Sequence, residues 1–594
     1  MPGTPTVTCQ DVGAPTPIAS NVTLEAYTYD FIIIGGGTSG CVLASRLSED
    51  RNVSVLVLEK GPVAETWSSR VPLMSGNPTG KGFRGAVWAS VPQPNVDNRS
   101  LRIVRGEALG GATRVNGMLY TRGTPGDYNR WQELGNPGWG YEDVEPYFVK
   151  SEQSHTHTAT YRGKAGLWQN TKASDSFKPT TFVDRALQAA GIEHVQDFNA
   201  PDAPAACTGL QDHMIDSSSY RHSTDRAFLP SHLVQERKAR LKICTNSLVT
   251  RIEFEKSASG DVRATGVHFE PSDSTAAVGQ GYFAKATREV ILCAGALVSP
   301  HILMLSGVGP KEHLVDNGIA VICDLPAVGD YLQDHVCLPM GWEVPLKDSL
   351  HHMQYSPLRA IMELVKYMIW GTGLFSFSFQ NVSTFFPTRL LDETLTIAKD
   401  DPRNHDTSDP DNRPDIEFMH IPTDCAWVIT PGRGAFSYLL THIRPKSRGS
   451  VRLVSSDLHV APAVDLGFFT NSEDFAPMRA GVRFALRIAE DVRKQGYPFA
   501  DLTVPESTSD EDIDKFIRKH VISCYHYTST CRMGAESHGA RPSVVDAELK
   551  VHGVRGLRVC DASVFPEIIG SHTMAPTVMV AEKCADMIKA SWSH

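Results

Sequence analysis

The residues of this chain whose types and spacing most directly predict chemistry are three glycines near the N-terminus and the glutamate that follows them. Gly35, Gly37 and Gly40 have the spacing G-x-G-x-x-G. In such a unit the first glycine permits a tight turn, the second lets the backbone approach a pyrophosphate, and the third allows close packing of helix on strand. Glu59 follows Gly40 by about 20 residues, where an acid hydrogen-bonds the ribose 2′-OH of a dinucleotide. The spacing predicts a dinucleotide site, and the acid argues against NADP.

The segments around these residues must form a strand, a helix and a second strand. Residues 31–34 are continuously apolar, which favours a buried parallel strand, and Val42, Leu43 and Leu47 give the next segment an apolar helical face. Residues 53–59 then form a second apolar run that ends in the acid. The N–H groups at the start of the helix favour a bound anion. The alternative is a tight glycine turn in another kind of α/β unit, which the complete order of strand, helix, strand and acid disfavours.

Length and composition limit the class of protein. At 594 residues the chain is too long for one core, so at least two domains are expected, and 41% hydrophobic residues are ordinary for a globular protein. The net charge of −10 offers no basic surface for nucleic acid or an anionic membrane. No segment approaches the ~20 apolar residues that span a bilayer. The richest, residues 367–379, is interrupted by glycines and is expected to line a core or an apolar pocket.

Neither the cysteines nor the N-terminus indicates export. The twelve cysteines lack C-x-x-C pairs and metal-ligand spacing, so we expect buried thiols, no disulfide framework and no metal site. The first residues have no basic region followed by an apolar one, so a secretory signal is not visible. The protein is expected to be intracellular, or secreted with its leader removed.

The rest of the chain divides into regions of different character. Residues 1–28 resemble a polar arm, and residues 62–104 are rich in glycine and proline. Residues 249–292 return to strand-like composition. Residues 347–413 are polar and irregular, which suits a variable loop or lid over a site.

Three further motifs identify a family. Residues 106–123 resemble the first signature of the glucose-methanol-choline (GMC) flavoprotein oxidoreductases, and residues 295–309 resemble the second. Residues 556–566, with 571–576 and a closing helix, are similar to the third landmark of that family. The resemblance covers nearly the whole chain from Tyr29 onward.

The resemblance implies an α/β fold, α+β overall, with two domains. One is a Rossmann-like FAD-binding domain, and the other is a substrate-binding domain built on an antiparallel sheet flanked by helices. The expected division is an arm at 1–28, an FAD-binding domain at 29–135, 237–335 and 540–594, and a substrate-binding domain at 136–236 and 336–539.

FAD is the cofactor that the resemblance implies. The pair Gly110-Gly111 suits a close approach of the backbone to a cofactor, and Asn116 offers an amide to a polar rim. In the family, this segment runs along the flavin, and Asp561 would bind its ribityl or pyrophosphate region. The alternative for Asp561 is a helix cap before Ala562. The residues expected at the cofactor are Gly35, Gly37, Thr38, Ser39, Gly40, Glu59, Gly110, Gly111, Asn116, Gly117, Val249, Asp561 and Thr573.

Four positions depart from the family pattern. Glu107 stands where an arginine is usual, Ala112 where a small hydroxyl or glycine is usual, and Asp330 where an asparagine is usual. Arg114 lies in the region where some members carry a histidine linked covalently to the flavin. We therefore expect non-covalent, dissociable FAD.

Two of the 22 histidines fall on the catalytic positions of the family, namely His526 and His572. An imidazole near its neutral pKa is well matched to an alcohol proton. The hypothesis is that His526 takes the hydroxyl proton while hydride passes to flavin N5, and that His572 holds the same oxygen. An aromatic residue just before the first histidine, here Tyr525, is similar to aryl-alcohol oxidases of the family. With Phe379 and Phe385 it indicates an apolar pocket for a primary aryl or allylic alcohol, although such aromatics also pack in cores.

Several functions remain open at this stage. The leading hypothesis is an alcohol oxidase that passes electrons to O₂ and forms hydrogen peroxide. A dehydrogenase using a quinone or another acceptor has the same first half-reaction. A flavin-containing lyase of the hydroxynitrile lyase type would perform no net oxidation. A fatty-acid photodecarboxylase and a non-enzymatic flavin protein fit the histidine pair less well. Beyond the alcohol and the electron acceptor no partner is expected, neither nucleic acid nor membrane, and the oligomeric state stays open.

Overall fold

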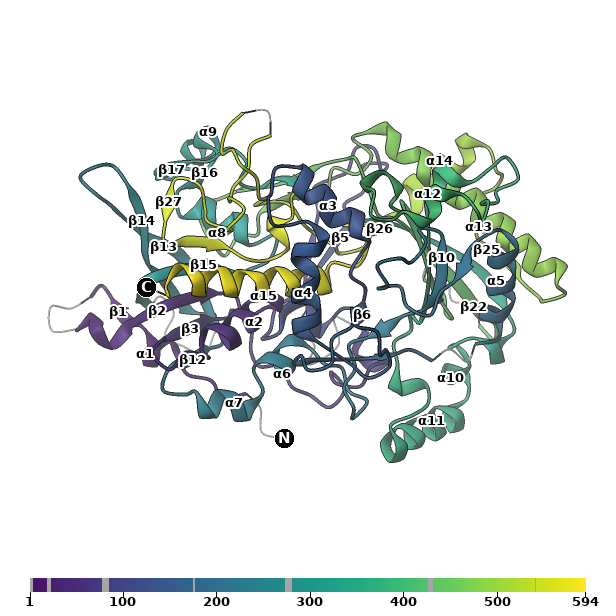
Figure 1. Cartoon of the computed structure of the whole chain (residues 1–594), viewed down its shortest axis with the longest axis horizontal. Coiled ribbons are helices and arrows are strands. Elements are labelled where there is room, and N and C mark those ends of the chain that lie inside the picture. Colours follow the sequence, from purple (N-terminus) through teal and green to yellow (C-terminus); the bar gives the residue numbers. More distant parts are fainter. Residues whose placement is uncertain are drawn as a thin grey trace.

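The computed structural model describes residues 4–18, 23–76, 85–174, 177–272, 280–425, 431–539 and 541–593. The chain forms two adjoining halves (Figure 1). Strands and helices from the N-terminal, middle and C-terminal parts of the chain share one half. The other half contains elements between α5 and α14, drawn from blue through teal and green to yellow-green. The predicted mixed α/β fold is confirmed.

A nine-stranded sheet lies at the centre of the first half, with the main strand order β12-β3-β2-β15-β14-β13. Its strands β12, β3, β2 and the end of β15 are parallel, whereas β13, β14 and β15 form an antiparallel meander. The first strand of the fingerprint is continuously buried from Phe31 to Ile34, as its apolar run predicts. The strands are β1 (Ala14–Thr16), β2 (Thr28–Ile34), β3 (Val55–Leu58), β12 (Leu241–Cys244), β13 (Ser247–Lys256), β14 (Val262–Pro271), β15 (Gly281–Leu292), β27 (Val554–Arg555) and β28 (Leu557–Val559).

Helix α2 (Thr38–Leu47) packs between this sheet and the C-terminal helix α15 (Met574–Ser591). The third fingerprint glycine makes the contact possible, because a Cβ on Gly40 would overlap the carbonyl oxygen of Gly35. Most of α15 is buried, including its glutamate Glu582, which pairs with Arg46 at 2.8 Å. Segments from near the two ends of the chain, α2 and α15, therefore pack in the same core.

An eight-stranded sheet forms the second half, with the main order β25-β19-β22-β21-β20-β10-β9 and β26 paired to β19. The pairs are antiparallel except for β9 with β10. The strands are β9 (Glu193–His194), β10 (Cys207–Leu210), β19 (Val336–Val344), β20 (Val382–Phe386), β21 (Ile416–Ile421), β22 (Gly434–His442), β25 (Ala500–Thr503) and β26 (Ile522–Ser523).

The two faces of the second sheet differ in chemistry. On one face Phe386, Phe418 and Leu440 belong to the core that α13 (Phe475–Lys494) covers. On the opposite face the register places Phe385 beside Glu417, Glu417 beside Thr441, and Thr441 beside Cys337. Because side chains alternate along a strand, this ladder points away from α13. The second face is therefore available to form a site.

Further helices complete both halves. They are α3 (Pro125–Glu133), α4 (Tyr141–Ser151), α5 (Lys178–Ala189), α6 (Thr224–Phe228), α7 (Ser231–Glu236), α8 (Ser299–Leu305), α9 (Lys311–Asp316), α10 (His352–Tyr355), α11 (Pro357–Trp370), α12 (Pro402–His405) and α14 (Asp510–His520). None of the helices within the described ranges is both long and apolar enough to cross a membrane.

Two expectations about irregular segments need correction. Within residues 1–28, the described part is not only an arm, because Val12 and Ala14 are buried and β1 pairs with β15. Residues 347–413 are not only a loop or lid, because they contain helix α11 and the interior strand β20. Each segment contains a short strand, β1 or β20, that pairs with strands from distant parts of the chain.

Candidate active site

The glycine turn and its acid meet at the ends of β2 and β3. Gly35 adopts a left-handed φ of 100°, which allows the tight turn between β2 and α2. The N–H of Gly36 donates to Glu59 Oε2 at 2.8 Å, and the N–H of Gly61 donates to Glu59 Oε1 at 2.7 Å. Burial raises the pKa of Glu59. The acid thus fixes the turn, while lone pairs on its oxygens remain for a ribose hydroxyl.

The start of α2 fits a pyrophosphate. The hydroxyl of Ser39 is buried and has no hydrogen-bond partner among the described residues. No side chain of the described residues caps this helix start, so the N–H groups of its first turn, including that of Thr38, stay available for an anion. A Cβ on Gly111 would lie 2.7 Å from the Cα of Gly37, so only glycines allow the two segments to approach this closely. The residues present therefore fit a dinucleotide.

Gly110 and Gly111 both take left-handed φ values, of 92° and 52°. Asn116 follows them, and its Oδ1 accepts from Met118 N at 3.1 Å and from Arg221 Nη1 at 2.9 Å. The amide of Asn116 is thus held within the protein next to Gly117. Of the other predicted cofactor residues, Val249 is buried on β13 and Thr573 is the N-cap of α15.

Asp561 serves a structural role that the helix-cap alternative anticipated. Its Oδ1 accepts from Ser563 N at 2.8 Å, capping a short 3₁₀ helix, and its Oδ2 accepts from Gly295 N at 2.9 Å and Ser299 Oγ at 2.5 Å. Burial raises the pKa of Asp561. The carboxylate ties the turn after β15 to the third motif. A direct contact between Asp561 and the cofactor stays a prediction.

The fold brings His526 and His572 together although they are far apart in sequence. His526 follows β26 and His572 precedes α15, and their ring centroids are 5.0 Å apart at an interplanar angle of 86°. A third imidazole, that of His335, stands before β19, and its ring centroid is also 5.0 Å from that of His526. Sequence reasoning missed His335, although it ends the run in which Asp330 departs from the family pattern.

The hydrogen bonds assign the proton on each of two rings. Nε2 of His335 lies 3.0 Å from the carbonyl oxygen of Ile569 and must donate to it. In a neutral ring the other nitrogen is then an acceptor, so His335 Nδ1 receives the Nδ1–H of His526 at 2.9 Å. The proton of His526 is therefore on Nδ1. Within the described ranges its Nε2 makes only a 4.0 Å contact with Cys524 Sγ, so its lone pair is available to a substrate.

The surroundings keep these rings neutral. Burial, followed by the neighbouring His572, lowers the pKa of His335 to about 3. Burial, followed by His335 and His572, lowers the pKa of His526 well below its ordinary value. Asp334 holds the backbone of this loop by accepting from His526 N at 2.8 Å, and burial raises the pKa of Asp334 to about 7.

Glu417, which sequence reasoning also missed, lies against His572. Its Oε1 is 3.1 Å from His572 Nε2 and also accepts from Ser383 Oγ at 2.8 Å. Only 1% of the Glu417 side chain is exposed. A buried carboxylate favours a proton on the facing nitrogen, which leaves Nδ1 of His572 for another partner. The site thus offers one imidazole nitrogen as a base and a second imidazole beside it.

The predicted pocket aromatics lie at different depths. Phe385 lines a cavity of about 40 Å³ together with Thr121 and Ser571, the neighbour of His572. Tyr525 is 39% exposed and has a left-handed φ of 62°, which turns the chain immediately before His526. Phe379 is half-buried ahead of β20. Phe385 therefore lies next to the strand position of Glu417, and Tyr525 lies in an exposed turn next to His526 in sequence.

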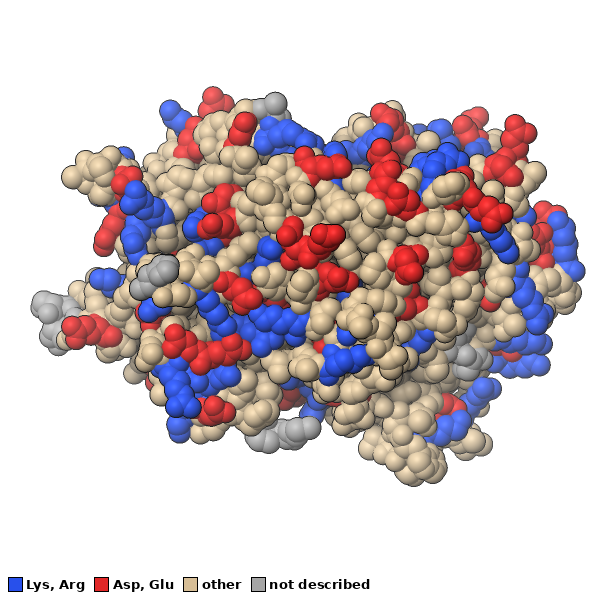
Figure 2. Space-filling view, in the orientation of Figure 1, with Lys and Arg blue, Asp and Glu red and all other residues tan. Residues whose placement is uncertain are grey.

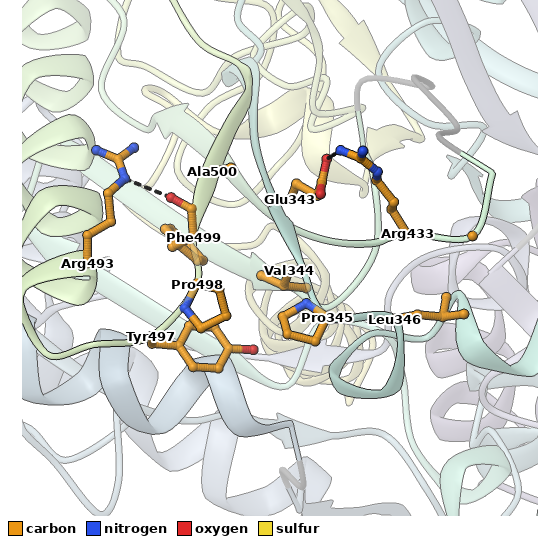
Figure 3. A pocket seen from close by; sticks show the side chains of 11 residues that line it. Glu343, Val344, Pro345, Leu346, Arg433, Arg493, Tyr497, Pro498, Phe499 and Ala500 are labelled. Atoms are coloured by element: carbon orange, nitrogen blue, oxygen red, sulfur yellow. Dashed lines mark hydrogen bonds and ion pairs between the residues drawn. The ribbon is translucent and has the colours of Figure 1, made fainter.

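A wider groove of about 530 Å³ lies at the opposite end of β19 from His335 (Figure 3). Glu343 and Arg433 form an ion pair at 2.5 Å on one side of it, and Tyr497 and Phe499 lie on the other. None of the histidines of the site lines this groove. Its volume alone therefore does not make it the catalytic site.

Comparisons with known proteins identify the family. Residues 29–337 and 445–581 match the models of the N- and C-terminal parts of the GMC oxidoreductase family. The chain is 33% identical to the oxygen-dependent choline dehydrogenase of Chromohalobacter salexigens, covering 95% of each chain. It is also 33% identical to a dehydrogenase of Strobilurus tenacellus, covering 95% of this chain and 94% of the other.

Solved structures give the same result. An FAD-dependent oxidoreductase from Chaetomium thermophilum has a TM-score of 0.83 and 26% identity, over 95% of this chain and 99% of the other. A fungal aryl-alcohol oxidase has a TM-score of 0.81 and 25% identity, with the same coverage.

Proposed function

The chain belongs to the GMC oxidoreductase family, as an FAD-dependent enzyme that acts on CH–OH groups, and from this premise we propose that it oxidises a primary alcohol to the aldehyde. The observation that carries the proposal is the neutral His526, whose Nε2 has a free lone pair beside a second imidazole. Such a nitrogen is suited to take a proton from a hydroxyl group.

Each histidine of the site has a separate proposed role at the substrate oxygen. His526 Nε2 takes the hydroxyl proton, and His335, which accepts from His526 Nδ1, keeps the ring in the required tautomer. His572, oriented by Glu417, lies beside His526, and a hydrogen bond that it donates to the same oxygen requires a proton on Nδ1 in addition to the one on Nε2 that faces Glu417. FAD, when bound, supplies the acceptor for the hydride that leaves the substrate carbon.

The substrate is proposed to be an aryl or allylic alcohol, and the final electron acceptor O₂. Support for the substrate class comes from Phe385, which lines a small cavity with Ser571, from the aromatic Tyr525 next to His526 in sequence, and from the similarity to an aryl-alcohol oxidase. Because the chain is similar to choline dehydrogenases, a cationic alcohol is the second candidate substrate. Its chemical basis here is the buried carboxylate of Glu417, a counter-charge inside the site.

FAD is proposed to be held without a covalent bond. Arg114, where some members of the family carry the linking histidine, is buried and pairs with Asp225 at 3.0 Å. A guanidinium engaged in a buried ion pair cannot serve as the attachment point. Denaturation followed by ultrafiltration should therefore release the flavin into the filtrate, whereas retention with the protein would contradict this part of the proposal.

Anaerobic mixing with a panel of aryl alcohols, choline, short alkanols and sugars tests the function. Bleaching of the flavin by aryl alcohols, and faster reoxidation by O₂ than by a quinone, are the expected results. Faster reoxidation by the quinone would make the enzyme a dehydrogenase. Absence of bleaching with every alcohol would reject the oxidation and favour a lyase.

A further inference from the structure

Helix α11 presents its more apolar face to solvent, the reverse of the usual pattern for a helix on a globular protein. Residues at helical spacing along this face have exposed fractions between 44% and 70%. They are Leu358, Ile361, Met362, Val365, Met368 and Ile369, with Trp370 beside them at the end of the helix. We call this set the outer face of α11.

Polar contacts on the inner side fix this orientation. Tyr367 is buried, and its hydroxyl donates to the carbonyl oxygen of Ser219 at 2.9 Å. Glu363, also buried, accepts from Leu374 N at 3.1 Å and pairs with Lys366 at 2.6 Å. Gly371 ends the helix in a left-handed conformation with φ 64°. Rotating the helix to bury its apolar face would break these contacts, so the outer face stays exposed in the folded protein.

The outer face lies at an edge of the molecule. In Figure 1, α11 projects below the second half with α10 beside it, and in Figure 2 the same place is a mainly uncharged protrusion. A contiguous apolar surface of this kind marks a contact site, because leaving it in water is unfavourable. The apolar run of residues 367–379 was expected to be internal. That expectation fails for Met368, Ile369 and Trp370, whereas Leu374 and Phe377 are buried.

The charges and aromatic residues around this face fit a lipid surface. Arg359 and Lys366 follow one border of the apolar stripe. Lys366 is paired with Glu363, whereas the charged end of Arg359 can reach phosphate groups. The only acid of the helix, Glu363, is on the inner side and paired. Tyr355 precedes the helix and Trp370 ends it, both exposed, as is typical of segments that lie at a membrane interface. At 14 residues, α11 is too short to span a bilayer.

We propose that the outer face of α11 docks this enzyme on the surface of a neutral phospholipid bilayer. The overall charge of −10 opposes attraction to anionic lipid, so the insertion of apolar side chains must supply the binding. The expectation of no membrane partner rested on the net charge, which disfavours anionic membranes, and on the lack of an apolar segment long enough to span a bilayer. Neither bears on a helix lying flat in a neutral interface. The proposal does not depend on which alcohol the enzyme oxidises.

A second copy of the chain fits the same face less well. A stable protein interface usually takes about 20–30 residues and roughly 800 Å² from each partner. The outer face offers one short, convex helix. Two such helices in contact would leave the rest of both molecules apart, unless further surface joined them.

Flotation of the flavin-loaded protein with phosphatidylcholine vesicles tests the proposal. The wild type should float with the vesicles, and Ile361→Glu with Ile369→Glu should lower the floating fraction at least about tenfold, since two charges would enter the apolar layer. Both positions are exposed, so flavin content and alcohol oxidation in solution should not change. Val315→Glu on α9 is the matched control, because Val315 is 58% exposed and remote in sequence.

Three results would overturn the proposal. The first is a wild-type protein that does not float with phosphatidylcholine. The second is binding that requires added phosphatidylserine, which would show attraction by charge. The third is a dimer of the wild type in sedimentation velocity that the double variant, but not Val315→Glu, converts to monomer without any vesicle binding by either. That result would assign the face to a second copy.

Discussion

The two sheets of this protein use their residues in different ways. The first sheet places backbone at its functional edge, since Gly35, Gly37 and Gly111 bring bare main chain to the start of α2. The second sheet places side chains on one face, where Glu417 and Thr441 follow Phe385 across three strands. On the proposed function, cofactor binding would depend on backbone geometry in the first half and proton transfer on buried polar side chains in the second. Changes in the two halves should therefore separate flavin binding from catalysis.

The largest expected effect is that of replacing His526, the proposed base, which should slow catalysis without releasing the flavin. Replacing His526 by alanine should slow anaerobic flavin reduction about 10²–10⁴-fold, the usual contribution of a positioned general base, with the flavin still bound. Stopped-flow reduction and the flavin-to-protein absorbance ratio measure the two effects. His459→Ala, at an exposed histidine, is the control. Unchanged reduction in His526→Ala would remove this residue from the mechanism.

A substitution next to the first sheet should have the opposite effect and weaken FAD binding. In Gly40→Ala the new Cβ would overlap the carbonyl oxygen of Gly35, so α2 must shift away from β2. We expect about 10–100-fold weaker FAD binding, corresponding to the roughly 1–3 kcal/mol of an overpacked core. Titration of the apoprotein with FAD measures it. Gly341→Ala on β19, whose Cβ would meet atoms no nearer than 3.5 Å, should bind FAD normally. Equal affinities for both variants would refute the backbone argument.

A smaller effect should follow from the acid of the second sheet. Glu417→Gln keeps an oxygen near His572 but removes the charge, and we expect about tenfold slower flavin reduction, from roughly 1–1.5 kcal/mol between charged and neutral hydrogen bonds. If Glu417 acts through His572, the change should have little further effect in a His572→Asn background. Full additivity of the two losses would show that Glu417 acts independently.

The last expected effect is on acid stability, not on catalysis. Burial on the core side of the second sheet lowers the pKa of His420 to about 3. Between pH 6.5 and about 3 the unfolded chain binds a proton there that the folded protein does not, so the free energy of unfolding falls as pH falls. His420 contributes at most about 1.4 kcal/mol per pH unit to this slope. Urea unfolding across this range should show a shallower slope for His420→Gln, and parallel curves would contradict the assignment.

Only the site residues that lie in sequence motifs could be predicted from the sequence. The glycine spacing and Glu59 are local in sequence, and the structure joins them through the hydrogen bond to Gly36. His526 and His572 were identified by family motifs, not by any pattern of their own. His335 and Glu417 carried no signal, because an isolated histidine or glutamate within a strand sequence is indistinguishable from a structural one. Their relation to the pair arises from strand register and loop closure.

The sequence by itself determined the nucleotide unit and the family and predicted two candidate catalytic positions, because those depend on short-range motifs that a linear chain displays. Only the tertiary structure decided which histidine nitrogen carries the proton and which face of α11 is exposed. Hydrophobic periodicity specifies that a helix has an apolar side, but contacts with distant residues such as Ser219 decide where that side points. Likewise, the tautomer of His526 depends on the carbonyl of Ile569, reached through His335.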